Sequence, residues 1–178
     1  MSDDSPRRTI FLDLETTGLY EWMDHEPWDI GMIVRDPWLG SYLDRPYQWF
    51  IKPDLEKADP IALGVGRFYK RLPREWADPQ MVAAKIAQLF DRAIIVGNVI
   101  DFDVRMLSYW ARRHGWCLTN NYHLVDVETL IAGKLGLKPP WNSRELFAKI
   151  GIDTEQFALH TGMGDAEMAR AGYDAVLP

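Results

Sequence analysis

The first part of the chain carries three short apolar runs separated by turn-forming residues. These runs cover residues 8–14, 28–34 and 47–51. Runs of this length, bounded by Gly, Pro and Asp, are typical of β-strands. Because the connections between them are short, we expect the three strands to pair as an antiparallel meander.

After the meander the pattern alternates between strand and helix. Residues 52–78 are rich in Pro, Gly and basic residues, which predicts a loop with one short helix. We expect Ser143 to be the N-cap of one later helix. Two further strands are predicted at 93–97 and 122–127. Helices are predicted at 79–91, 103–114, 143–150 and 163–176, and a short helix follows the 122–127 strand and ends at 132.

These elements predict a single α/β domain. Strands first and strand–helix alternation afterwards favour a mixed central sheet of about five strands, flanked by helices. Three of these strands would form the antiparallel meander and the others would be parallel. A length of 178 residues is ordinary for one domain. We expect residues 1–8 to form a flexible tail and residues 9–178 to form the domain.

Composition and charge narrow the classes of function. The formal net charge of −6 argues against a protein that coats nucleic acid by bulk electrostatics. It leaves open an enzyme that handles a few nucleotides at a metal site, where cations reverse the local field. Cys117 is the only cysteine, so an intrachain disulfide is excluded. No run approaches roughly 18 apolar residues, and we expect a cytoplasmic protein without a membrane partner.

The stretch FLDLETTGL, residues 11–19, places two acids in an otherwise apolar strand. Side chains two residues apart in a strand share a face, so Asp13 and Glu15 are expected to project together. Two such charges repel, and the pKa of each rises unless something compensates. Mg²⁺ or Mn²⁺, which prefer oxygen ligands, would compensate. The alternative is that one acid is a solvated charge at the end of the strand.

Two later stretches carry further candidates. In NVIDFDVRML an acid, Asp101 or Asp103, follows an apolar strand. In HTGMGDA, Asp165 follows His160 by five residues and lies in the first turn of the last predicted helix. Simple helix capping would also explain Asp165, since a helix N-terminus stabilises a carboxylate by about 0.3–1 kcal/mol. Taken alone, His160 is more often a surface histidine or one packed in the core than a general base.

With these three stretches the sequence resembles the DEDDh superfamily of 3′–5′ exonucleases, the DnaQ-like group on a ribonuclease H-like fold. The resemblance spans roughly residues 9 to 175 and is most specific in FLDLETTGL. It implies a general base, His160, and two Mg²⁺ ions, for which Mn²⁺ would substitute. The implied metal ligands are Asp13, Glu15, Asp103 and Asp165. The resemblance also implies that Thr16, through its backbone, and Leu19 lie against the terminal nucleotide.

The sequence departs from the family pattern in two places. The family usually has His-Asn shortly before the Phe-Asp of its second motif, and here those places hold Asn98 and Val99. We prefer Asp103 to Asp101 as the ligand because FDVRML keeps the family's Phe-Asp and the leucine four residues later. The third motif has Gly162 where the family usually has alanine.

Aromatic residues beside basic ones are candidates for contact with a substrate strand. The stretch RFYKRLPR, residues 67–74, suits a single-stranded end, with bases stacked on Phe68 or Tyr69. Trp22, close after the first motif, is a candidate for stacking on the terminal base. The alternative for each is packing against the core or within a loop.

The resemblance implies a metal-dependent 3′–5′ exonuclease that acts on the 3′ end of single-stranded DNA, RNA or short oligonucleotides and releases nucleoside 5′-monophosphates. Two alternatives stay open. One is a catalytically inactive protein of the same fold that binds nucleic acid or a polymerase, and the other is a Mg²⁺-dependent phosphohydrolase of free nucleotides. A homodimer and a polymerase or RNA-processing partner also stay open.

Overall fold

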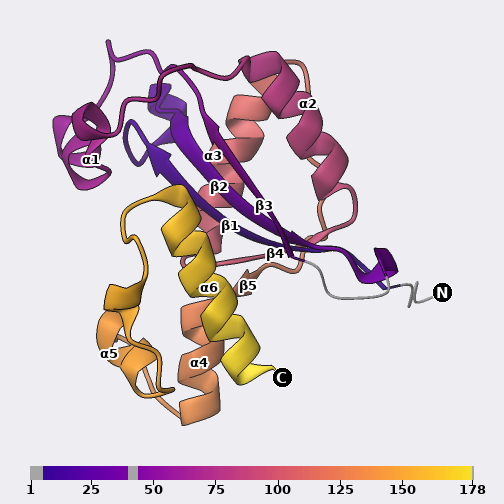
Figure 1. The fold of residues 1–178 in the computed structure, drawn as a ribbon, viewed down its shortest axis with the longest axis vertical. Helices are drawn as coiled ribbons and strands as arrows, with labels where there is room; N and C mark the ends of the chain where they lie inside the picture. Colours follow the sequence, from indigo (N-terminus) through magenta and orange to yellow (C-terminus); the bar gives the residue numbers. More distant parts are fainter. Residues whose placement is uncertain (1–5, 40–43, 178) are drawn as a thin grey trace.

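A five-stranded mixed sheet forms the centre of the structure (Figure 1). The computed structural model describes residues 6–39 and 44–177, so most of the expected N-terminal tail lies outside the described residues. The strand order is β3-β2-β1-β4-β5. The strands are β1 (Thr9–Thr16), β2 (Pro27–Arg35), β3 (Asp44–Phe50), β4 (Ile94–Gly97) and β5 (Val125–Asp126).

Strand pairing follows the predicted division. The β1–β2 and β2–β3 pairs are antiparallel, whereas β1–β4 and β4–β5 are parallel. The prediction of a meander extended by parallel strands is therefore confirmed. Within the described residues, no helix is long and apolar enough to cross a membrane.

Helices cover both faces of the sheet (Figure 1). Alternate residues of β1 point to opposite faces: Leu12 packs with α2 and α3, and Phe11 packs with α4, α5 and α6. The helices are α1 (Pro60–Val65), α2 (Pro79–Phe90), α3 (Ile100–Arg113), α4 (Val127–Leu135), α5 (Ser143–Ala148) and α6 (Gly162–Val176).

Some predicted boundaries were wrong. Helix α3 begins at Ile100, directly after Val99, which has a left-handed φ of 53° and whose amide donates to the Asp126 carboxylate (2.6 Å). The N-cap of α5 is Asn142, whose side chain accepts from the Glu145 amide, so Ser143 is the first helical residue instead. Strand β5 has only two residues, because its second, Asp126, is already the N-cap of α4.

The N-terminus of α6 lies directly on the backbone of β1 and β2. A Cβ atom built on Gly31 would stand 1.9 Å from the Gly162 carbonyl carbon, and one built on Gly162 would stand 2.6 Å from the Gly31 nitrogen. Neither position has room for a side chain. This contact explains why the third motif has Gly162 where the family usually has alanine.

Substitution of Gly31 by alanine is expected to push α6 away from the sheet. Overpacking of a core contact typically costs about 1–3 kcal/mol of unfolding free energy, and denaturant unfolding would measure the loss. Gly133→Ala is the matched control, since a Cβ there meets nothing within 4 Å. That control is expected to be neutral or stabilising by up to about 1 kcal/mol. Equal stability of Gly31→Ala and wild type would contradict the proposed close contact.

Candidate active site

The first acidic pair lies at the carboxyl end of β1. Asp13 and Glu15 occupy the same face of the strand as Phe11, the face that α6 covers. Glu15 is buried and Asp13 is half-buried. The structure therefore brings the two carboxylates to one face, as the period of two predicts.

The second motif contributes Asp103 from the first turn of α3. Its side chain returns to β1, where Oδ1 accepts a hydrogen bond from the Leu14 amide at 3.1 Å, and Asp103 is only 3% exposed. Asp101 points away: its side chain is 76% exposed and pairs with Arg105 at 3.0 Å. Of the two candidate acids, the structure places only Asp103 beside Asp13 and Glu15.

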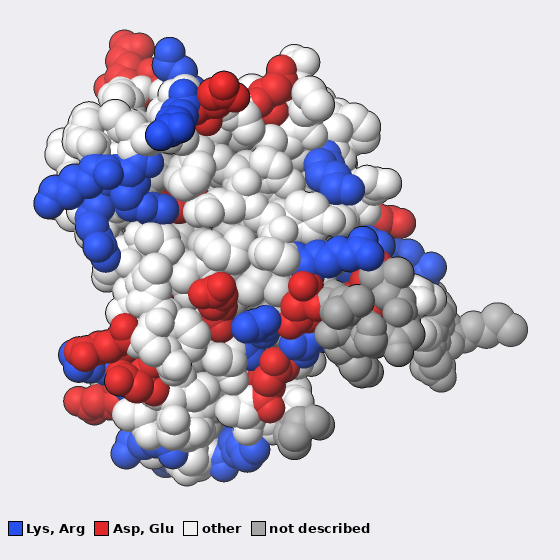
Figure 2. Space-filling view, viewed as in Figure 1, with Lys and Arg blue, Asp and Glu red and all other residues white. Residues whose placement is uncertain are grey.

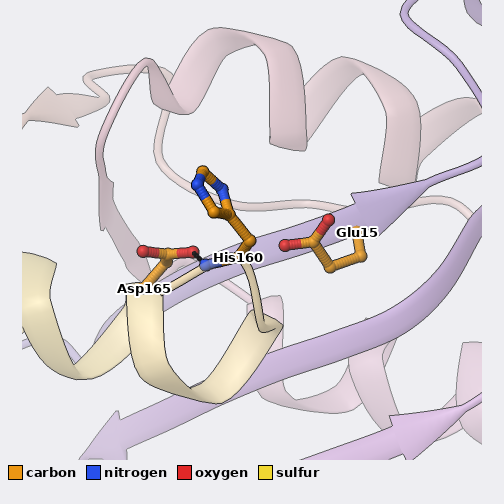
Figure 3. Close-up of side chains that lie close together, drawn as sticks. All are labelled: Glu15, His160 and Asp165. Carbon is orange, nitrogen blue, oxygen red and sulfur yellow. Dashed lines mark hydrogen bonds between the residues drawn. The ribbon is translucent and has the colours of Figure 1, made fainter. Parts of the chain in front are cut away.

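The third motif brings His160 and Asp165 close to Glu15 (Figure 3). Thr161 caps α6 by accepting from the Gly164 amide, so Asp165 lies in the first helical turn. The Asp165 carboxylate accepts a hydrogen bond from the His160 amide at 2.7 Å. One ligand-capable atom from each of Glu15, His160 and Asp165 lies within 4.8 Å of the other two.

The four carboxylates repel one another. Burial raises the pKa of Asp13 well above its usual value, and the charges of Asp103, Asp165 and Glu15 raise it further. Burial, followed by the charge of Asp165, raises the pKa of Glu15 to about 7. Burial is also the main cause that raises the pKa of Asp103 and of Asp165, against the hydrogen bonds that each carboxylate accepts.

The donor set fits hard divalent cations. Carboxylate oxygens are the ligands that Mg²⁺ and Mn²⁺ prefer, and bound cations would remove the repulsion that raises these pKa values. Arg71 and Arg67 only partly offset the repulsion, by lowering the pKa of Glu15. Divalent cations would supply the positive charge that this cluster lacks.

The predicted substrate contacts fall into two groups. Leu19 and Trp22 are exposed on the loop after β1, and Tyr69 is 69% exposed. Thr16 is buried, and its hydroxyl donates to the Gly18 carbonyl (2.7 Å), which stabilises the turn after β1. Stacking of a base on Phe68 is contradicted by its burial: it is 3% exposed.

Phe68 is a core residue because its ring packs edge-on against Trp28, with the centroids 5.0 Å apart. The basic segment that contains both Phe68 and Tyr69 therefore has a buried side and an exposed side. Figure 2 shows Lys and Arg side chains gathered on the surface over α1 and the segment after it. The exposed basic residues of that segment are Arg67, Lys70 and Arg74.

Sequence reasoning missed two residues that shape the site, His25 and Asp29. His25 fixes the loop after β1, since its Nδ1 accepts from the Tyr20 amide at 3.0 Å while its Nε2 bonds to the Lys57 carbonyl at 3.1 Å. Asp29 is fully buried in β2 and forms an ion pair with Arg71. An acid inside the apolar run WDIGMIV is the one signal that could have identified Asp29.

Comparison with known proteins agrees with this geometry. The model of the RNase T exonuclease family, described as "Exonuclease", matches residues 10–171. No curated protein sequence matches the chain. A solved structure titled "3′-end specific recognition of histone mRNA stem-loop by 3′-exonuclease" superposes with a TM-score of 0.66 at 13% identity.

The similarity to that structure covers 97% of this chain and 65% of the other chain, so this chain spans less than two thirds of that protein. At this identity the similarity establishes the fold alone, and the fold is ribonuclease H-like. The family match extends over nearly the whole chain and includes all three acidic motifs. The chain therefore belongs to the RNase T-type exonuclease family of the DEDDh superfamily.

Proposed function

We propose that the protein is a metal-dependent 3′–5′ exonuclease. In this proposal it removes nucleotides from the 3′ end of single-stranded DNA, RNA or short oligonucleotides and releases nucleoside 5′-monophosphates. The observation that carries the proposal is the convergence of one histidine and four acids from three distant parts of the chain. The solved relative is titled as a 3′-exonuclease, which supports the same polarity.

The four carboxylates are the proposed ligands of two Mg²⁺ ions. Four negative charges against four positive ones leave the site near neutral before a phosphate arrives. When bound, two such ions stabilise the charge that develops on the attacking and leaving oxygens of the phosphodiester. The proposed ligands are Asp13, Glu15, Asp103 and Asp165.

His160 is the proposed general base. A histidine readily exchanges a proton near neutral pH, and the exposed position of His160 lets it face a substrate. It would take a proton from the attacking water as the water oxygen bonds to phosphorus. The bond from phosphorus to the 3′ oxygen of the penultimate nucleotide breaks, and that oxygen takes up a proton. The products are a nucleoside 5′-monophosphate and a strand one nucleotide shorter.

Exposed apolar and aromatic side chains beside the site are the proposed contacts for the terminal nucleotides. Leu19 and Trp22 follow β1 directly, and the Trp22 ring lies 4.8 Å from that of Tyr20. Tyr69 stands on the basic segment. Stacking on such rings is tolerant of base identity, which suits an enzyme that degrades a strand stepwise.

Labelled oligonucleotides test the proposed function. With Mg²⁺, a 5′-labelled oligonucleotide should yield a ladder that shortens by single nucleotides, and a 3′-labelled one should release labelled mononucleotide at once. EDTA should abolish both. Binding without cleavage would favour the inactive nucleic-acid-binding protein. Hydrolysis of a nucleoside triphosphate with the oligonucleotide left intact would favour the nucleotide phosphohydrolase.

The first prediction concerns the general base. His160→Ala should lower kcat by roughly 10²–10⁴, the usual contribution of a general base, because the attacking water loses its proton acceptor. Mn²⁺ binding, measured by calorimetry, should persist because the carboxylates remain. Full activity of this variant would remove His160 from the mechanism.

The second prediction separates the two acids of the second motif. Asp103→Asn should abolish cleavage because the buried position loses a charge that the metals require. Asp101→Asn, the matched control on the same helix, should retain wild-type activity because Asp101 faces solvent and Arg105. The opposite pattern in a cleavage assay would overturn Asp103 as the ligand.

The third prediction concerns metal-free protein and Glu15, whose pKa is about 7 in the folded state against 4.5 ordinarily. Between these values the folded state binds more protons than the unfolded state, so unfolding free energy falls as pH rises. Relative to Glu15→Gln, metal-free wild type should lose about 1–3 kcal/mol between pH 4.5 and pH 8.

Chemical denaturation of both proteins in EDTA at several pH values would measure this difference. Saturating Mg²⁺ should remove most of it, because a bound cation favours the charged carboxylate. Parallel pH profiles of wild type and Glu15→Gln in EDTA would show that Glu15 is not destabilised by its surroundings.

A further inference from the structure

The backbone around His160 is held on both sides. Its φ of 58° is in the left-handed region, which residues other than glycine rarely adopt without support. The His160 amide is held by Asp165, and its carbonyl accepts from Arg71 Nη1 at 3.1 Å. The preceding carbonyl, that of Leu159, accepts from Arg67 Nη2 at 2.8 Å. The loop conformation thus depends on groups outside the loop.

The Arg71 side chain is fixed in turn by the core. Besides the His160 carbonyl, Nη1 reaches the Gly66 carbonyl at 3.0 Å. Nη2 pairs with Asp29, and the guanidinium lies 5.0 Å from the centroid of the Trp28 ring. The planar fork of arginine holds several acceptors at once. With both its Nη1 and Nη2 groups bonded inside the protein, Arg71 is poorly placed to bind a substrate phosphate.

Asp29 ties the same ion pair to the other side of the loop. Its carboxylate accepts from the Gly162 amide at 3.1 Å and from Gln48 Nε2 at 3.0 Å, in addition to Arg71. A fully buried carboxylate needs such partners, because a buried charge left unpaired is strongly destabilising. The Asp29–Arg71 pair therefore contacts the backbone at residues 160 and 162.

We propose that Arg71, held by Asp29, is a positioning residue that orients His160 for proton transfer. This inference rests on the proposed function, in which His160 is the general base. Displacement of a catalytic group by about 1 Å can lower a rate by 10². Arg71 thus serves the reaction through the His160 loop, although it belongs to the basic segment that the sequence assigns to substrate contact.

A second effect of Arg71 has to be separated from this one. Its charge lowers the pKa of Glu15, so its loss would also change the metal site. Arg71→Lys keeps a positive charge at this place but replaces the planar fork with a single ammonium group. Positioning requires the fork, whereas the effect on Glu15 requires only the charge.

A double-mutant cycle with His160→Ala tests the proposal, using steady-state cleavage of a 5′-labelled oligonucleotide with saturating Mg²⁺. In wild type, Arg71→Ala should lower kcat about 10- to 100-fold and change KM less than about 3-fold. In the His160→Ala background the same substitution should lower kcat less than about 3-fold, since residues that act as a unit are not additive. With His160 present, Arg71→Lys should lower kcat at least about 5-fold. If Arg71→Ala fails to fold, Arg71→Lys takes its place in the double-mutant cycle.

Arg35→Ala is the matched control. Arg35 also pairs with two carboxylates, those of Asp44 and Asp174, and its guanidinium lies 5.0 Å from the centroid of the Phe11 ring, at the other end of β1. Any effect of its loss on kcat should be the same factor with and without His160. Mn²⁺ calorimetry on each variant reports whether the metal site persists.

Three results would overturn the positioning role while leaving the exonuclease intact. These are an equal loss from Arg71→Ala in both backgrounds, a raised KM with unchanged kcat, and full activity of Arg71→Lys. Full activity of His160→Ala would instead refute the general base of the proposed function, and the positioning role with it. An inactive wild type would refute the exonuclease activity itself.

Discussion

The direct backbone contact between Gly31 and Gly162 determines where the site can form. Asp13 and Glu15 are fixed by β1, whereas His160 and Asp165 arrive with the N-terminus of α6. These two groups meet only because the strand and the helix approach without side chains between them, as the contacts of a Cβ built at either glycine show. Interiors are packed too closely to absorb an added methyl group. A displacement of α6 by the width of one methyl would separate the two halves of the site.

This close approach has an electrostatic consequence. The fold gathers four carboxylates in a partly buried place, where burial and mutual repulsion raise their pKa values. Such an arrangement opposes folding unless cations bind, and functional sites are commonly less stable than the scaffold that holds them. The sheet and its two apolar clusters supply the stability that the site lacks.

The sequence predicted those parts of the site that local periodicity determines. A period of two puts Asp13 and Glu15 on one face wherever the strand lies. The choice between Asp101 and Asp103 depends on a helix: about 100° per residue turns their side chains roughly 200° apart, so one faces the site and the other faces solvent. Because α3 begins at Ile100, earlier than predicted, this opposition was not visible in the sequence.

Pairings between distant segments were not predictable from the sequence alone. Phe68 and Tyr69 are neighbours, and Phe68 is the buried one because its ring packs with Trp28, Leu63 and Trp76. Asp29 and Arg71 are 42 residues apart, and neither belongs to the motifs that carry the family resemblance. Local patterns assign a charge to an element, but its partner is set by how the elements pack.

The Asp29–Arg71 pair also changes how the basic segment contributes to substrate attraction. Arg71 is paired with the buried Asp29, and Arg67 is bonded to the Leu159 carbonyl, so Lys70 and Arg74 are the other exposed cations of the segment. In a chain with a net charge of −6, so few exposed cations on this segment give only a weak nonspecific attraction for phosphates. On the proposed function, the attraction for a 3′ end therefore arises mainly from the divalent cations at the four carboxylates. Substrate capture and catalysis would then depend on the same ions.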